Sequence, residues 1–219
     1  MNKFGSNLLI YLDILSLTLT VLSLIYYWHY IKEEKVLLPI VTLVISQFLL
    51  IGLSHILYLQ KQNNHWVFHI NANSSFFLIS LFFTNYLPNR IYIKFLQICL
   101  PILYVLLLQN TIFKFNSIGF ASYSFFIVLL CLIYYLSILK KPLIPNIVED
   151  ATFWFVTALF IYYTCSFVIF VSYEALSNKG IKVGYLWRVH NVFVFLYSIT
   201  MIYAFSKFVK NESSNNTNN

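Results

Sequence analysis

Histidines and carboxylates stand in or beside the apolar stretches of this chain, where an ionisable side chain is costly and by default marks a functional site. His65 and His69 are four residues apart, so on a helix both could face one metal ion. Three protein ligands and an open position let zinc activate a water molecule for hydrolysis. This spacing is not an established metal motif, and His65 could equally be a loop residue. The candidate zinc ligands are His65, His69 and His190, with His55, Asp13 or Glu174 as further donors.

Asp13 is predicted to lie several residues inside the first apolar stretch. Inserting a carboxylate into a bilayer costs about 2.5–3.5 kcal/mol, so such a residue needs a partner. Arg188, near the start of the last stretch, is the expected partner. The other ionisable residues of the stretches gather mostly toward the same end of the predicted bundle, which favours a polar pocket there. The predicted ligand-binding or interior polar cluster comprises Asp13, Gln47, His55, His69, Asn73, Glu174, Arg188, His190 and Asn191.

The elements that must position these residues are long uncharged runs. Charged residues make up 10% of the 219 residues and hydrophobic residues 60%, which leaves too few charges for a water-facing surface. A helix needs about 20 apolar residues to cross a bilayer, and each run has roughly that length or more. The runs are Ile14–Ile31, Val36–Gln60, Gln62–Asn89, Phe95–Phe113, Phe115–Leu139, Ala151–Tyr173 and Val189–Ser206.

These runs predict an all-α fold, a polytopic membrane helix bundle with about seven transmembrane helices. A transmembrane barrel would instead show strict alternation over segments of about ten residues. The connections are too short for a soluble domain, so residues 1–210 are predicted to form a single helix-bundle domain in contact with the lipid bilayer. Residues 211–219 are polar and are predicted to be a disordered tail.

Loop charges predict the orientation, because cytoplasmic loops carry more Lys and Arg than loops on the other side. With seven spans, eight of these residues fall on the side of the C-terminus and six on the side of the N-terminus. The N-terminus is therefore predicted outside and the C-terminus inside. The net charge of +7 is scattered over the loops, which argues against nucleic acid as a partner.

Polar side chains repeat along one face of four predicted helices. Stripes of this kind turn toward other helices in a membrane. The bundle should therefore have a polar interior, which either only joins the helices by hydrogen bonds or also binds a ligand. The stripes comprise Asp13, Ser16, Thr20, Ser23, Tyr27 and Tyr30; Gln47, Ser54, His55 and Tyr58; His65, His69, Asn73, Ser80 and Thr84; and Arg188, Asn191 and Ser198, with His190 beside them.

Three functions follow from this pattern. The sequence has no Walker loop, dinucleotide-binding fingerprint or GxSxG motif, which favours a receptor-like, accessory or regulatory protein that binds a ligand or a partner. The first alternative is a membrane-embedded, metal-dependent lipid hydrolase that uses the histidines and Asp13, with zinc as cofactor. The second is a small oligomeric channel or transporter, against which the shortage of mid-span glycine counts.

Short motifs open the last two predicted helices, namely Phe153-Trp154 and the run Leu186-Trp187-Arg188-Val189-His190-Asn191. In the third predicted helix, Asn71 and Asn73 precede Phe76-Phe77. With these motifs the chain resembles, over nearly its whole length, an uncharacterised family of small seven-helix inner-membrane proteins of Bacteroidota. The resemblance implies no activity. It implies a bacterial inner membrane and a sensory or regulatory partner.

Overall fold

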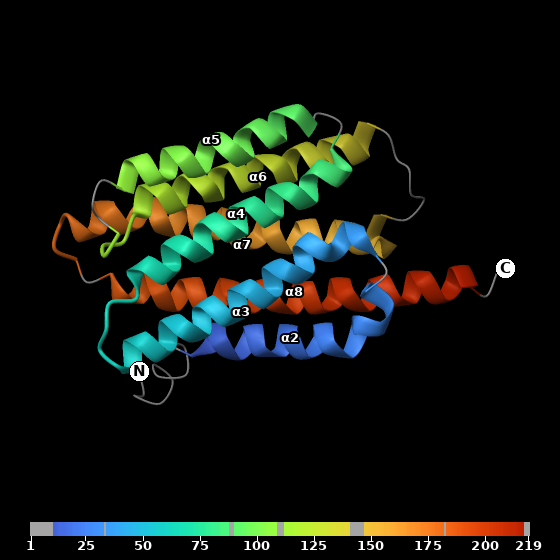
Figure 1. Ribbon diagram of the computed structural model, residues 1–219, viewed down its shortest axis with the longest axis horizontal. Helices are drawn as coiled ribbons and strands as arrows, with labels where there is room; N and C mark the ends of the chain where they lie inside the picture. The colour runs from blue at the N-terminus through green and yellow to red at the C-terminus, as the bar shows by residue number, and fades with distance from the viewer. Residues whose placement is uncertain are drawn as a thin grey trace.

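Over the residues that it describes, the computed structural model is an all-α bundle of seven long helices, as the apolar runs predict (Figure 1). Each helix overlaps one of the predicted runs. The helices are α2 (Leu12–Ile31), α3 (Leu38–Leu59), α4 (His65–Tyr86), α5 (Arg90–Leu108), α6 (Ser117–Lys140), α7 (Ala151–Ser177) and α8 (Gly184–Asn216), with short 3₁₀ helices η1 (Lys35–Leu37) and η2 (Ile147–Glu149) before α3 and α7. The structure describes residues 11–32, 34–87, 90–108, 112–140, 147–181 and 183–216, the side chains of 107–108 and 208–216 excepted.

Within the described residues, six of the helices are long and apolar enough to cross a bilayer. They are α2, α3 with the preceding 3₁₀ turn, α4, α6, α7, and α8 as far as Lys207. The protein is therefore a multi-pass integral membrane protein whose helices contact lipid. The prediction of about seven spans is met by six candidates, because α5 is not among them when only its described residues are counted.

Local signals set where two of these helices begin and where one ends. The Asp150 carboxylate accepts a hydrogen bond of 2.9 Å from the Thr152 N–H and caps the start of α7. After α7, Gly180 has a φ of 71°, a left-handed conformation that glycine adopts without strain. The Asn63 side chain accepts from the His65 N–H at 3.0 Å, so His65 is the first residue of α4 and not a loop residue.

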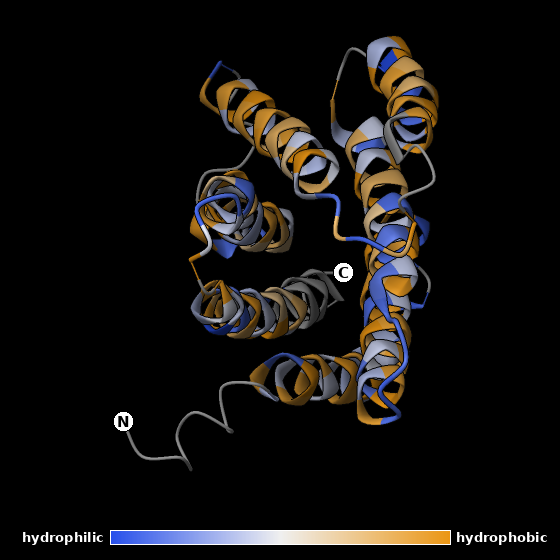
Figure 2. Ribbon diagram, turned by 90° about the vertical axis from the view of Figure 1, so that its left-hand side faces the viewer, coloured by the Kyte–Doolittle hydropathy of each residue, from blue (hydrophilic) through white to orange (hydrophobic). Residues whose placement is uncertain are grey.

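Six helices form a closed ring around a common interior. Following the ring, α2, α3, α4, α6, α7 and α8 each pack against the next, and α8 packs against α2. Helix α5 lies outside the ring, mainly against α4. Figure 2 looks along the bundle and shows the helices largely in hydrophobic colours, with hydrophilic colours concentrated in the connections. Because lipid removes the hydrophobic drive between helices, close packing and interhelical hydrogen bonds must hold the ring together.

The polar stripes face the ring interior over most of their length. Tyr30 and Tyr58 depart from this prediction, with 41% and 60% of their surfaces exposed. Both lie in the last turns of their helices, where an amphipathic ring can turn toward the membrane surface. The buried members of the stripes are Ser16, Thr20, Gln47, Ser54, His69, Ser80, Thr84, Asn191 and Ser198.

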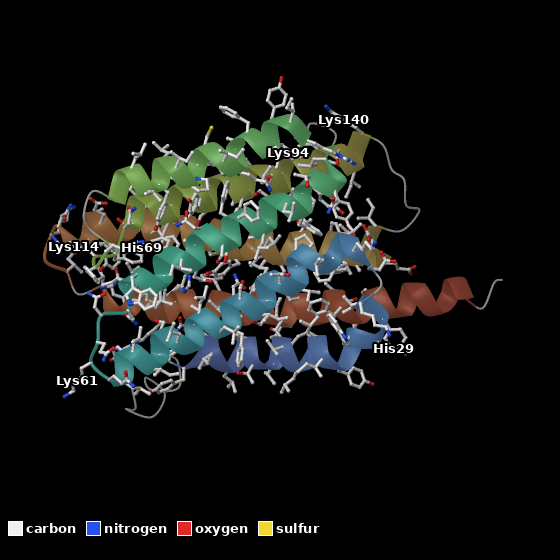
Figure 3. All side chains as sticks on the ribbon, in the orientation of Figure 1. His29, Lys61, His69, Lys94, Lys114 and Lys140 are labelled. Carbon is white, nitrogen blue, oxygen red and sulfur yellow. The ribbon has the colours of Figure 1, made fainter. Side chains whose placement is uncertain are left out.

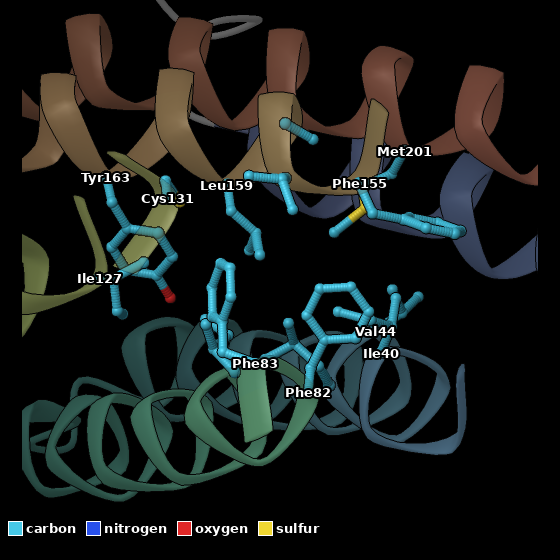
Figure 4. Packing of buried hydrophobic residues seen from close by; sticks show 14 of the residues in the cluster. Ile40, Val44, Phe82, Phe83, Ile127, Cys131, Phe155, Leu159, Tyr163 and Met201 are labelled. Atoms are coloured by element: carbon cyan, nitrogen blue, oxygen red, sulfur yellow. The ribbon is translucent and has the colours of Figure 1, made fainter. Parts of the chain in front are cut away.

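One half of the ring interior is filled by apolar side chains. Phe82 and Phe83 of α4 face Phe155 and Leu159 of α7, and all four side chains are fully buried (Figure 4). The Phe155 ring meets that of Phe205 edge-on at 5.1 Å, which extends the contact to α8. Among the described residues, apolar side chains fill this half of the ring. Further members of this core are Ile40, Val44, Ile127, Cys131 and Met201.

Consecutive helices run in opposite directions, so the connections alternate between the two ends of the bundle. Figure 3 shows Lys61 and Lys114 at one end, here named the Lys61 end, and His29 and Lys140 at the other, here named the Lys140 end. The filled half of the interior lies toward the Lys140 end, because Phe82 and Phe83 precede the end of α4 there. The orientation in the membrane, with the N-terminus outside, stays a prediction.

Helix α8 continues as far as Asn216, so it extends into the segment for which the sequence predicts a disordered tail. Residues 217–219 lie outside the described residues. The division into a bundle of residues 1–210 and a tail of residues 211–219 stays a prediction.

Candidate functional site

The ring interior is hollow toward the Lys61 end. Two adjoining lobes have a volume of about 80 Å³ each. Taken together, they are lined by side chains from all six ring helices, and none of the described lining residues comes from α5. Since about 10–15 Å³ of such space admits one water, each lobe has room for about five waters or for a small molecule. The two lobes form one cavity because they share the lining residues Gln47, Ile51, Phe68, Asn71, Tyr162, Trp187 and His190.

Asp13 lines the second lobe and is hydrogen-bonded to His55. The His55 Nε2 lies 3.2 Å from both carboxylate oxygens, and the Ile14 N–H donates to one of them at 2.8 Å. Asp13 lies in the first turn of α2, where the helix dipole favours a negative charge. The carboxylate is therefore held at the end of its helix by two donors, and not several residues inside a span as the sequence suggested.

The predicted pair between Asp13 and Arg188 is not found among the described residues. In the part of the chain that the structure describes, the side chain that contacts the Asp13 carboxylate is His55, and Arg188 lines neither lobe. The cavity-facing residues of α8 follow the i, i+3, i+4, i+7 spacing of one helix face. Arg188 is not at one of these positions, because it comes one residue after the first of them. The cavity-facing residues of α8 in this series are Trp187, His190, Asn191 and Val194.

Gln47 joins two sides of the ring in the wall of both lobes. The Tyr197 hydroxyl of α8 donates to Gln47 Oε1 at 3.1 Å, and Gln47 Nε2 donates to the Ser75 hydroxyl of α4 at 3.5 Å. All three side chains are buried. An amide that uses both its oxygen and its nitrogen has a fixed orientation. Gln47 is therefore a structural support of the cavity wall as well as a polar lining group.

Aromatic rings form much of the remaining wall, and His190 lies among them. The His190 Nε2 is 3.2 Å from the Tyr162 hydroxyl, and the two rings meet edge-on at 5.5 Å. Trp187 of α8 stacks on Phe68 of α4 with ring centroids 6.3 Å apart and 22° between the planes. Asn191 is buried and lines the second lobe. The faces of these rings carry partial negative charge, which suits them to contact with a cation.

The amide of Asn71 lines both lobes and has an unused acceptor. Its Oδ1 is buried and accepts no hydrogen bond from the described residues. A buried carbonyl oxygen without a donor costs about 1–3 kcal/mol. Such groups are few in native proteins, and a water or ion can account for one of them. Asn71 is not a member of the cluster predicted from the sequence.

His69 and Asn73 belong to a separate network between α4 and its neighbours α5 and α6. The His69 Nδ1 is 2.7 Å from the Tyr104 hydroxyl, and its Nε2 is 3.0 Å from the Lys114 carbonyl oxygen. The Tyr123 hydroxyl donates to Asn73 Oδ1 at 2.6 Å. Neither His69 nor Asn73 lines the cavity, so these two predicted cluster residues support its wall from behind.

The three predicted zinc ligands are not brought together. The Lys114 carbonyl can only accept, so His69 donates from Nε2 and accepts from Tyr104 at Nδ1, which leaves neither nitrogen for a metal. His65 Nδ1 is buried without a hydrogen-bond partner, and His190 faces the cavity. In the described part of the chain, no three His, Cys, Asp or Glu side chains lie close enough to hold one ion.

Glu174 lies away from the cavity, in a groove between α6 and α7 on the outer side of the ring. It accepts a hydrogen bond of 2.8 Å from the Ser117 hydroxyl and is exposed. The groove measures about 500 Å³ and is mainly apolar. Glu174 is thus a surface residue and not part of an interior cluster. Other groove residues include Ile118, Phe125, Phe126, Phe167 and Val171.

The structure therefore divides the predicted cluster. Asp13, Gln47, His190 and Asn191 line the cavity, and His55 binds Asp13. Asn71 and the aromatic lining are not among the cluster residues predicted from the sequence. A signal for some of the rings exists, because a tyrosine hydroxyl in the middle of an apolar run needs a polar partner in lipid. The cavity tyrosines with this signal are Tyr123, Tyr162, Tyr163 and Tyr197.

Comparisons with protein-family models, with curated proteins and with solved structures give no match for this chain. No family is therefore identified, and the resemblance to the Bacteroidota family stays a prediction. The structure supports a multi-helix membrane protein with seven helices, six of which are candidate spans within the described residues.

Proposed function

We propose that this protein is a receptor-like or regulatory membrane protein that binds a small ligand in the cavity of the ring. The observation that carries the proposal is the composition of the cavity wall, where Asp13, Gln47, His190 and Asn191 stand among aromatic rings. Ligand sites are concave and mostly apolar, with a few converging polar groups that fix the orientation of the ligand. Following the resemblance and the loop charges, we place the protein in a bacterial inner membrane with the cavity toward the outside.

The contrast between the two halves of the ring favours binding over an open channel. Toward the Lys140 end, the interior is filled by Phe82, Phe83 and Phe155, which are fully buried. A channel requires a continuous path with polar lining across the whole membrane, whereas a transporter exposes one site to each side in turn. The filled half blocks a continuous path within one copy of the chain. It also gives the hollow half a rigid boundary, which reduces the entropy lost when a ligand binds.

The hydrogen bonds of the histidines favour binding over metal-dependent hydrolysis. A catalytic zinc needs three protein ligands. His69 uses both ring nitrogens within its own network, and the Nε2 of His55 is directed at the Asp13 carboxylate. His190 remains as a cavity group, where one imidazole can donate or accept a hydrogen bond to a ligand.

Thermal unfolding of the purified protein in detergent tests the proposal against a library of small polar and aromatic compounds. A ligand at 100 times its Kd stabilises the folded state by about 2.7 kcal/mol, which raises the unfolding midpoint. Ile51 lines both lobes, so Ile51→Phe adds a ring to the cavity and should abolish these shifts. Ile45→Phe makes the same change on the lipid-facing side of α3, where Ile45 is 41% exposed, and should retain them.

Compounds that stabilise the native and Ile45→Phe proteins but not the Ile51→Phe protein would support the proposal. The midpoint of each variant without ligand shows that it is folded. Equal shifts in all three proteins would place the binding site elsewhere. The absence of a shift with every compound would leave the cavity with a structural role only, and either result would contradict the proposal.

A further inference from the structure

Among the described residues, the wall of the cavity carries a carboxylate and no Lys or Arg. Asp13 is that carboxylate. Neutral His55 can donate its Nε2 proton to Asp13, so this hydrogen bond does not require the carboxylate charge to be cancelled. His190, the other ionisable group apart from the tyrosines, contacts Tyr162 through a hydrogen bond that a neutral imidazole can make. The electrostatic preference of the cavity is therefore for a cation.

Aromatic faces surround the same space. Trp187 and Phe68 stack on each other across α8 and α4, and both line the two lobes together with Tyr162. Asp13 lines the second lobe together with Phe68, Tyr162 and Trp187, so the carboxylate and the rings face the same space. Tryptophan and tyrosine faces attract cations, and the attraction strengthens when water is excluded.

Hydrogen-bond acceptors in the wall favour a cation that still carries N–H groups. The Asn71 Oδ1 accepts no hydrogen bond from the described residues. A side-chain amide can turn about its last bond, which exchanges the positions of its oxygen and nitrogen. Asn71 can therefore present its oxygen to either lobe when a donor is bound there. A protonated amine supplies such donors to both Asp13 and Asn71, whereas a quaternary ammonium ion supplies none.

The size of the cavity limits the ligand. Each lobe of about 80 Å³ admits roughly five waters, so the two together suit a molecule of about five to ten non-hydrogen atoms. We propose that the ligand is a small protonated amine with an apolar or aromatic body, whose ammonium group binds Asp13 and whose body packs against the rings that line the second lobe, Trp187, Phe68 and Tyr162. This inference rests on the proposed ligand-binding function and names the chemical class of its ligand.

Three probes of nearly equal shape test the charge preference by isothermal titration calorimetry at pH 7. They are benzylammonium, benzyl alcohol and benzoate, which present a cation, a neutral group and an anion on the same ring. The native protein should bind benzylammonium at least about tenfold more tightly than benzyl alcohol, and should not bind benzoate. Asp13→Asn keeps an oxygen acceptor for His55 and loses the charge, so the preference should fall to about twofold or less. Glu174→Gln removes a carboxylate outside the cavity and should leave the preference unchanged.

The outcomes separate this inference from the proposed function. If benzyl alcohol or benzoate binds as tightly as benzylammonium, the cavity is a ligand site but the cation inference is wrong. A preference for benzylammonium that survives in Asp13→Asn would also overturn the cation inference. Failure of all three probes to bind would overturn it as well. The library screen tests the proposed ligand-binding function separately. If Asp13→Asn does not fold, Phe68→Leu removes a ring and keeps the carboxylate. That variant should weaken benzylammonium binding more than benzyl alcohol binding, and an equal loss would overturn the inference.

Discussion

His69 uses both of its ring nitrogens inside the protein. The Lys114 carbonyl fixes the proton on Nε2, which leaves Nδ1 to accept from the Tyr104 hydroxyl at 2.7 Å. The imidazole also stacks on Phe120 with 4° between the ring planes. A single side chain of α4 is thereby joined to α5, to α6 and to the connection between them. Its role is to hold helices together beside the cavity.

We predict that His69→Leu destabilises the protein by about 2–4 kcal/mol, because the Lys114 carbonyl and the Tyr104 hydroxyl would each lose a buried partner. His65→Leu is the matched control on the same helix, one turn away. The His65 Nδ1 is buried without a hydrogen-bond partner, so that substitution should cost little. Thermal unfolding midpoints of the two variants at one heating rate provide the measurement. A midpoint loss for His65→Leu as large as that for His69→Leu would contradict the network.

At the residue scale, the sequence could predict which polar groups face inward but not which of them meet. Asp13 and His55 each belong to a predicted stripe, since helical periodicity follows from the chain alone. Their pairing depends on α2 lying beside α3, while Arg188 is excluded by the register of α8. Asn71 is not predicted as a cluster residue, because the lack of a hydrogen-bond partner for its Oδ1 depends on three-dimensional packing.

At the scale of the elements, α5 is the helix that stands apart. It packs outside the ring, mainly on α4, and contributes nothing to the cavity wall. Its Tyr104 side chain reaches inward to His69 and stacks on Tyr123 with ring centroids 4.8 Å apart. The apolar run predicted a helix at this place. Its position outside the ring could not be predicted, because α6 and α7 likewise carry none of the four predicted polar stripes and yet belong to the ring.

Gly119 of α6 makes room for the Tyr104 ring. A methyl group at this position would overlap that ring and the Asn116 side chain. We predict that Gly119→Ala costs about 1–3 kcal/mol, because Tyr104 is held by His69 and Tyr123 and cannot move aside freely.

Gly52→Ala is the control for this prediction, since the added methyl would lie 3.8 Å from the nearest side-chain atom, Ile14 Cδ1. That change should be neutral or stabilise α3 by about 0.5–1 kcal/mol, as expected for alanine in a helix interior. Thermal unfolding of both variants in the same detergent compares them. Equal midpoints would show that α5 can shift on α4 and α6 without loss.

At the scale of the whole molecule, the ring has one filled and one hollow half. The orientation of the protein therefore decides which side of the membrane the cavity faces. The loop charges predict that the Lys61 end lies outside, and the cavity lies toward that end. The apolar run of α5 also predicts a seventh span, which is not among the six candidates found in the described residues. At about 1.5 Å per residue, its 19 residues extend about 28 Å, close to the thickness of the hydrocarbon layer.

Single cysteines at exposed lysines test both points, by labelling spheroplasts with a membrane-impermeant maleimide. Cys99 and Cys165 are first replaced by alanine, whereas Cys131 is fully buried and can stay. With the N-terminus outside and α5 spanning, Lys61→Cys and Lys114→Cys should react in intact spheroplasts. Lys140→Cys should then react only after permeabilisation. The inverse pattern would reverse the orientation and place the cavity toward the cytoplasm. Reaction of Lys61→Cys without Lys114→Cys would show that α5 does not cross, because the chain passes between these two lysines through α4 and α5 alone.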